Sequence, residues 1–120
     1  MKKILVADDD PHVLFLISEV LTRGHYEVSQ AVNGYMAMQQ VSGVMPDLVV
    51  LDVMMPGIDG FEICRRIKND PALRHIKVIM VTAKTQGRDI QAGLSAGADH
   101  YITKPFKIAE LSSKIKKLIG

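Results

Sequence analysis

One aspartate stands where α/β proteins often carry reactive groups. Asp52 directly follows four large apolar residues, 48–51, which predict a strand that is buried on both faces. The segment Met55-Pro56-Gly57 behind it can neither continue a strand nor begin a stable helix. Asp52 is therefore expected at the end of a rigid strand, where its carboxylate can act as a nucleophile. Taken alone, the residue could also be an ordinary turn former.

Other polar residues follow apolar segments in the same way. They are Asp8 and Asp9 after residues 4–7, Thr82 after residues 77–81, and Lys104 after a short strand near 100–102. Neighbouring carboxylates repel one another and bind a cation, and a set with only oxygen ligands favours Mg²⁺. A hydroxyl and an ammonium group opposite them suit a phosphoryl group, because Thr82 can donate a hydrogen bond to it and Lys104 can offset its charge. The predicted chemistry is transfer of a phosphoryl group to Asp52.

Strands and helices must alternate for these residues to meet. Strands are expected near 4–7, 26–31, 48–51, 77–81 and 100–102, and helices near 11–24, 34–42, 59–69, 86–96 and from 108 onward. This alternation predicts an α/β fold, a doubly wound, flavodoxin-like parallel sheet of five strands with five helices. The polar segment 26–31 and the short segment 100–102 suit the sheet edges, which favours the strand order 2-1-3-4-5. Ligands of such sheets bind at the carboxyl ends of the strands, beside strands one and three.

Helical spacing also predicts which side chains face the core. In the first helix these are Val13, Leu16, Ile17, Val20 and Leu21. The helix near 86–96 is weaker, because Gly87 and Gly93 interrupt it and only Ile90 and Leu94 can anchor it. We expect that helix to be the most mobile element of the fold.

Length and composition restrict the class of protein. The 120 residues are expected to form one domain, 1–120, with a core of its own. Cys64 is the only cysteine, so it is interpreted as a small buried hydrophobic residue. A net charge of +2 does not indicate nucleic acid as a partner, and no apolar run is long enough for a membrane span. Because Met1-Lys2-Lys3 leads directly into a strand, we expect no signal peptide and a cytoplasmic protein.

The last predicted helix and its approach are basic. The residues concerned are Lys107, Lys114, Lys116 and Lys117. Such a face is usually only solvated, and a docking surface is the alternative.

Together these residues resemble the receiver domains of two-component response regulators, over residues 3–118. The resemblance rests on Asp8-Asp9, Asp52 within Leu-Asp-Val-Met-Met-Pro-Gly-Ile-Asp-Gly, Thr82-Ala83, and Lys104-Pro105-Phe106. It implies that a histidine kinase or a histidine phosphotransfer protein donates a phosphoryl group to Asp52. It also implies that Asp9, Asp52 and the backbone carbonyl of Met54 hold Mg²⁺, with Asp8 acting through water. The domain would be no enzyme, although it would assist its own phosphorylation and dephosphorylation.

The resemblance also implies a switch. Thr82 and Ala83 would contact the phosphoryl group, Thr82 would shift toward it, and the ring of Tyr101 would turn inward. The face formed by the fourth helix, the fifth strand and the fifth helix would then bind a downstream protein or a second copy of the chain. Neither nucleic acid nor a membrane is expected as a direct partner. In that family the peptide bond between Lys104 and Pro105 is cis, whereas most X-Pro bonds are trans.

Two residues are expected at the mouth of the predicted site. Met54 and Lys84 lie two positions after Asp52 and Thr82, respectively. There Lys84 is predicted to slow hydrolysis or to contact the phosphoryl group. A solvated lysine without a role is the alternative.

Three other functions fit the sequence less well. A phosphatase resembling the haloacid dehalogenase family would need a second aspartate two residues after its nucleophile, and that position is Met54. The complete set of acidic residues disfavours a passive interaction module. The sequence also lacks the glycine-rich phosphate loop that would indicate a nucleotide enzyme. Since the chain ends at Gly120, after the last predicted helix, it is expected to be either a stand-alone regulator or the receiver part of a larger multidomain regulator.

Overall fold

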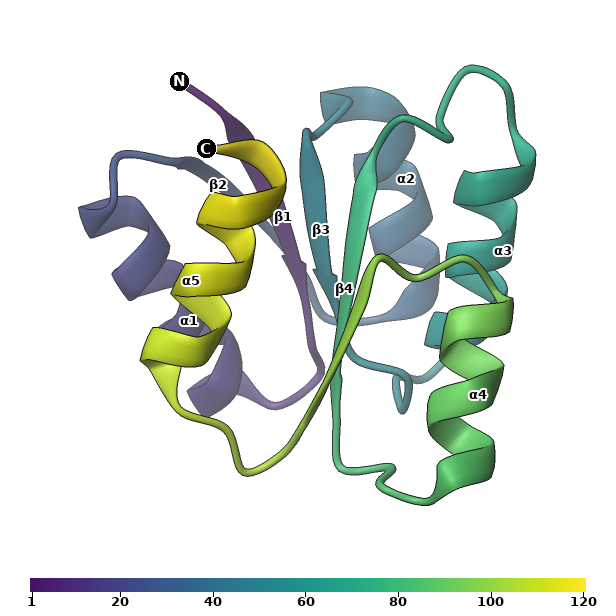
Figure 1. The fold of residues 1–120 in the computed structure, drawn as a ribbon. Helices are drawn as coiled ribbons and strands as arrows, with labels where there is room; N and C mark the ends of the chain where they lie inside the picture. The colour runs from purple at the N-terminus through teal and green to yellow at the C-terminus, as the bar shows by residue number, and fades with distance from the viewer.

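The computed structural model describes residues 1–120, in which five strands and five helices alternate along the chain (Figure 1). The strands are β1 Lys3–Ala7, β2 Glu27–Ala31, β3 Leu48–Leu51, β4 Lys77–Thr82 and β5 His100–Thr103. The helices are α1 Pro11–Arg23, α2 Gly34–Val44, α3 Gly60–Asn69, α4 Gly87–Ser95 and α5 Ile108–Ile119. All neighbouring strands are parallel, in the order β2-β1-β3-β4-β5. The predicted fold class and strand order are confirmed.

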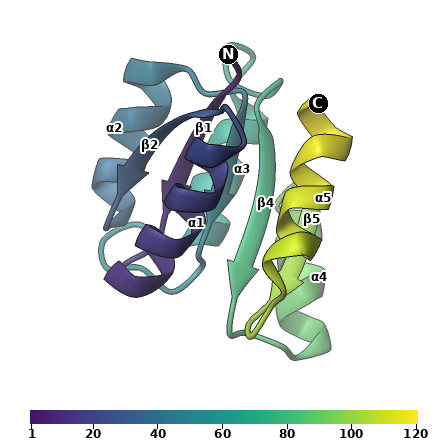
Figure 2. The same cartoon turned by 90° about the vertical axis from the view of Figure 1, so that its left-hand side faces the viewer.

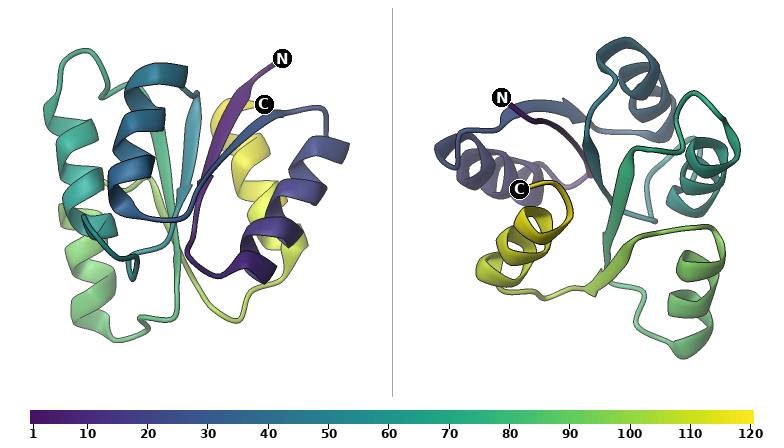
Figure 3. Two further views of the ribbon diagram at one scale, coloured as in Figure 1. Left: turned by 180° about the vertical axis from the view of Figure 1, so that it is seen from behind. Right: turned by 45° about the horizontal axis from the view of Figure 1, so that its top comes forward.

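Helices cover both faces of the sheet. α1 and α5 lie on one face, and α2, α3 and α4 lie on the other (Figures 2 and 3). Successive residues of a strand point to opposite faces, so Ile4 and Val6 join the core under α1 and α5, while Leu5 and Ala7 join the core on the other face. Residues 4–7 of β1, all of β3 and residues 78–81 of β4 are continuously apolar because both faces of these strands are covered. They form the rigid base from which the site residues project.

Side-chain caps determine where three helices begin. The capping contacts are Asp10 Oδ1 with the His12 N–H at 2.9 Å, Asn33 Oδ1 with the Met36 N–H at 2.8 Å, and Asp59 Oδ1 with the Glu62 N–H at 2.9 Å. Each cap satisfies an N–H group that has no partner within its helix, which is worth about 1 kcal/mol. The cap at Asp10 starts α1 directly after the two aspartates that follow β1, and so keeps that turn short.

In two helices periodicity predicted some of the inward residues wrongly. In α1, Ile17 and Leu21 are buried as predicted, but Leu16 is 53% exposed, and Leu14, which was not predicted, is buried. In α4, Leu94 is 48% exposed and does not anchor the helix. An apolar i, i+3, i+4 pattern allows two overlapping stripes, and the position of the neighbouring sheet decides which one is buried.

Glycine did not interrupt helices where the sequence suggested that it would. α4 begins at Gly87 and continues through Gly93, which is buried. α2 continues through Gly43 to Val44, and Met45 caps it with a φ of 54°, in the left-handed region.

None of the five helices has the length and the apolar character that a membrane span requires.

Candidate functional site

Three carboxylates meet at the carboxyl edge of the sheet. Ala7 of β1 and Leu51 of β3 are paired neighbours, so the residues that follow them leave the sheet side by side. Oxygen atoms of Asp8, Asp9 and Asp52 consequently all lie within 4.8 Å of one another. Asp8 is 3% exposed and Asp52 is 6% exposed, whereas Asp9 lies on the surface. The cluster is thus buried on one side and open to solvent on the other.

The backbone around Asp52 is held on both sides. Its N–H donates to the Ala7 carbonyl at 2.9 Å, and its Oδ1 accepts from the Met54 N–H at 3.1 Å. Gly60, the first residue of α3, packs against this turn so closely that a Cβ would lie 2.6 Å from the Asp52 carbonyl oxygen. Only glycine fits at that position, and the close approach of α3 fixes the direction in which Asp52 leaves β3.

Lys104 brings the positive charge predicted for the site. Its Nζ lies 2.8 Å from Asp8 Oδ2 and 3.2 Å from Asp52 Oδ2. Its backbone N–H donates to the Thr82 carbonyl at 2.8 Å, and the peptide bond between Lys104 and Pro105 is cis, as the resemblance implies. The ammonium group of Lys104, which follows β5, thus bridges the two carboxylates that follow β1 and β3.

The charges of the site act on one another. Burial by itself lowers the pKa of Lys104, but its hydrogen bond to Asp8 and the charge of Asp52 outweigh burial, and the net direction is upward. Burial raises the pKa of Asp8, against the lowering effect of the hydrogen bond from Lys104. Lys104 therefore stays protonated, while the three acidic groups face a single cation. The cluster retains excess negative charge for a further cation.

The donor set fits an oxygen-liganded divalent ion. Oxygens on opposite sides of a Mg²⁺ ion are about 4.2 Å apart, and the three carboxylates already lie close to that span. The side chain of Asp9 makes no hydrogen bond or ion pair within the protein, unlike those of Asp8 and Asp52, so its oxygens are free to act as ligands. Neither a histidine nor a cysteine belongs to the cluster, which favours a hard cation over zinc.

Thr82 and the two residues after it form the opposite wall. Thr82 ends β4, the neighbour of β3, and is fully buried. Its Oγ1 has one long contact, 3.4 Å from the Lys84 N–H, and the Ala83 N–H donates no hydrogen bond within the protein. Both groups remain able to donate to a ligand. Met54 is 57% exposed, and its N–H donates to Asp52 Oδ1.

The loop after β4 is tied to β5 and to α4. The Tyr101 hydroxyl donates to the Lys84 carbonyl at 2.8 Å, and Lys84 Nζ lies 3.9 Å from Asp89 Oδ1. Burial raises the pKa of the Tyr101 hydroxyl, and the charges of Asp89 and Asp52 act in the same direction. Asp89 was not predicted from the sequence. The only signal was an acidic residue in the first turn of a helix shortly after Lys84.

Comparison with known proteins agrees with this geometry. Residues 4–116 match the family described as response regulator receiver domain. The chain is 40% identical to the DNA-binding dual master transcriptional regulator RpaA of Synechocystis sp. over 119 residues, which cover 99% of this chain and 49% of RpaA. It is 41% identical to the response regulator PleD of Caulobacter vibrioides over 116 residues, or 97% of this chain and 26% of PleD.

The fold also has a close counterpart among solved structures. The chemotaxis response regulator CheY4 of Vibrio cholerae superposes with a TM-score of 0.91 at 27% identity, and the match covers 99% of each chain. RpaA and PleD are longer, since the chain spans about half of the first and a quarter of the second.

Proposed function

The chain belongs to the response regulator receiver domain family of two-component systems, and from this membership we propose that Asp52 accepts the phosphoryl group. The observation that carries the proposal is the position of its carboxylate. Asp52 is held at the end of a buried strand, 3.2 Å from Lys104 Nζ and within 4.8 Å of the other two acidic groups. Of the three acidic residues, only Asp52 follows β3, the strand that pairs with β4 and therefore lies beside Thr82.

The proposed donor is a phosphohistidine of a histidine kinase or of a histidine phosphotransfer protein. An Asp52 oxygen attacks phosphorus, an O–P bond forms, the N–P bond breaks, and the departing imidazole nitrogen keeps the electron pair and takes up a proton. Mg²⁺, when held by Asp9, Asp52 and the Met54 carbonyl with Asp8 acting through water, supplies positive charge to the phosphoryl oxygens.

Three groups of the chain would hold the transferred phosphoryl group. Lys104 would exchange its contact with Asp52 for one with a phosphoryl oxygen, so that its charge stays neutralised. The Thr82 hydroxyl and the Ala83 N–H would donate to the other oxygens. The domain thereby assists its own phosphorylation, and it assists dephosphorylation by admitting water to the phosphoryl group, an approach that Met54 and Lys84 would restrict.

The proposed output follows from the loop after β4. Movement of Thr82 toward the phosphoryl group displaces Lys84, whose carbonyl accepts the Tyr101 hydrogen bond. In this structure the Tyr101 ring already packs against the core beside Gly93, so phosphorylation would act by holding the ring in this inward position. The face formed by α4, β5 and α5 would then keep the shape that a downstream protein or a second copy binds. We propose a cytoplasmic location and no direct contact of residues 1–120 with nucleic acid. DNA binding in RpaA would then reside in the half of that protein that this chain does not match.

Intact mass spectrometry after incubation with acetyl phosphate and Mg²⁺ tests the proposal. We expect one added phosphoryl group on the wild type, none on Asp52→Asn and none after chelation of Mg²⁺. Asp59→Asn is the matched control, because asparagine caps α3 as well as aspartate does and the site is untouched. An adduct that persists in Asp52→Asn would move the phosphoacceptor elsewhere. Continuous release of phosphate over many turnovers would support the phosphatase, and the absence of any adduct would support a passive module.

A further inference from the structure

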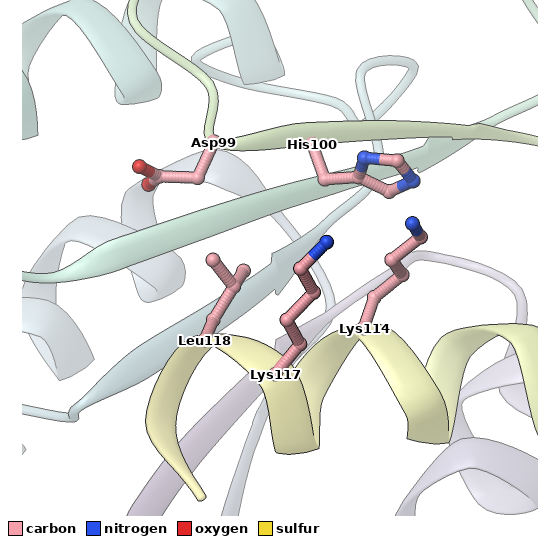
Figure 4. A pocket seen from close by; sticks show the side chains of 5 residues that line it. All are labelled: Asp99, His100, Lys114, Lys117 and Leu118. Atoms are coloured by element: carbon pink, nitrogen blue, oxygen red, sulfur yellow. The ribbon is translucent and has the colours of Figure 1, made fainter.

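A concave site lies between α5 and the residues that begin β5 (Figure 4), whereas Lys104 follows the other end of that strand. It encloses about 100 Å³, and its lining residues are Asp99, His100, Lys114, Lys117 and Leu118. Lys114 and Lys117 stand one turn apart on α5, and both side chains extend toward β5 (Figure 4). The site is large enough for one short side chain and too small for a nucleotide.

The positive charge of this pocket is not neutralised within the protein. Neither Lys114 nor Lys117 belongs to any of the ion pairs of the chain. Asp99 is already engaged, because its Oδ2 accepts from Lys68 Nζ at 2.9 Å and from the Val78 N–H at 2.8 Å. In Figure 4 its carboxylate points away from the two lysines. The two ammonium groups are therefore free to bind an anion.

His100 forms the third polar wall. Burial lowers the pKa of its imidazole, and the charge of Lys114 lowers it further, against the smaller raising effect of Glu110. The lowered pKa favours the uncharged ring, which presents one N–H donor. Leu118 adds an apolar surface beside these donors.

We propose that this pocket binds a glutamate or aspartate side chain from an acidic segment of a partner protein. The two ammonium groups would bind the carboxylate, the imidazole would donate a hydrogen bond, and Leu118 would contact the methylene groups. This inference rests on the proposed function, in which the face formed by α4, β5 and α5 binds a partner, because the pocket lies on that face. The inference adds that the partner carries negative charge where it contacts the pocket.

The charge distribution disfavours two other occupants. Residues 107–119 carry four lysines and one glutamate. A twofold dimer that places α5 against α5 of the second copy would set this basic surface against itself, and like charges across an interface disfavour association. Nucleic acid would need a longer basic track, whereas the whole chain carries only +2 and Asp99 and Glu110 flank the lysines.

The experiment is a titration of the full, unphosphorylated chain with acetyl-tetraglutamate amide, followed by nuclear magnetic resonance. We expect the largest shifts at His100 and along α5, with affinity falling as salt is added. Lys114→Gln/Lys117→Gln should bind about tenfold more weakly, because two charge contacts are lost. Lys114→Arg/Lys117→Arg should retain binding. Lys116→Gln is the matched control, since Lys116 is exposed on the same helix but does not line the pocket.

Several results would overturn the proposal. One is that the Lys114→Gln/Lys117→Gln variant still binds the peptide, and another is that Lys116→Gln loses binding equally. The others are that a short DNA duplex binds more tightly through the same lysines, or that the chain sediments as a dimer through α5. Thermal unfolding of each variant shows whether it is folded. Phosphorylation of Asp52 is measured separately by intact mass, so failure of the proposed function and failure of this inference are distinguishable.

Discussion

Replacement of Gly93 by alanine tests how the structure positions Tyr101. The glycine lies in α4 with the tyrosine ring over it, and a Cβ added there would stand 2.7 Å from Tyr101 Cδ2, 2.8 Å from Cε2 and 3.0 Å from Met80 Sδ. Ordinary van der Waals contact begins near 3.4 Å. The ring must therefore move by roughly 0.7 Å or more, which disturbs the hydrogen bond from its hydroxyl to the Lys84 carbonyl.

The expected cost follows from three contributions. Overpacking in a filled core costs about 1–3 kcal/mol. Weakening of the hydrogen bond from Tyr101 costs about 1 kcal/mol more, and the better helix propensity of alanine returns about 1 kcal/mol. We therefore expect Gly93→Ala to lower the free energy of unfolding by about 1–3 kcal/mol.

Urea denaturation measures this change, and the chain offers its own controls. A Cβ added at Gly43 in α2 or at Gly87 at the start of α4 would have no atom within 4 Å, so alanine should fit at both positions. Gly43→Ala should stabilise the protein by up to about 1 kcal/mol. If Gly93→Ala were as stable as Gly43→Ala, the close contact between α4 and the Tyr101 ring would be refuted. Resonances of the Tyr101 ring should shift in Gly93→Ala and stay unchanged in both controls.

Three further measurements test the site and the core. Mg²⁺ at about ten times its dissociation constant should raise the free energy of unfolding by about 1.4 kcal/mol, less in Asp9→Asn, and an unchanged wild type would contradict the metal site. Phosphorylated Lys84→Ala should lose its added mass several times faster than the wild type, on the order of 2–5-fold, if Lys84 impedes water; equal decay would leave Lys84 without this role. Burial raises the pKa of Cys64 from 9.0 to about 11, so the neutral thiol stabilises the fold below pH 9 and that stability is lost as the pH rises toward 11. Cys64→Ala should lack this part of the alkaline loss in pH-dependent urea unfolding.

Much of the candidate site could be predicted from the sequence because its residues follow strands that are recognisable as apolar runs. A continuous apolar run in an α/β chain belongs to a buried parallel strand, and the carboxyl ends of such strands share one edge of the sheet. This reasoning placed Asp8, Asp9 and Asp52 together, and the oxygen atoms of the three residues do meet there. It also placed Lys104 beside them, where its ammonium group bridges two of the carboxylates.

Periodicity was less reliable for helices. It named Leu16 in α1 and Leu94 in α4 as inward residues, and both are about half exposed. It also treated Gly93 as an interruption of α4, although the glycine allows α4 to approach Tyr101. A helix with several apolar residues can present more than one stripe, and only the surface that it packs against selects one.

The α/β architecture and the edge of the sheet at which chemistry can occur could be determined from the sequence alone. The order of the elements, the apolar strands and the polar residues that follow these strands were enough, because both features depend on local pattern and on the pairing rules of parallel sheets. The tertiary structure alone decided that Lys84 pairs with Asp89, that Tyr101 lies on Gly93 and that two lysines of α5 face His100 across a small pocket. Those contacts join residues from different elements. The distances between these residues depend on how the helices pack on the sheet, and the spacing of residues within one helix or strand does not specify that packing.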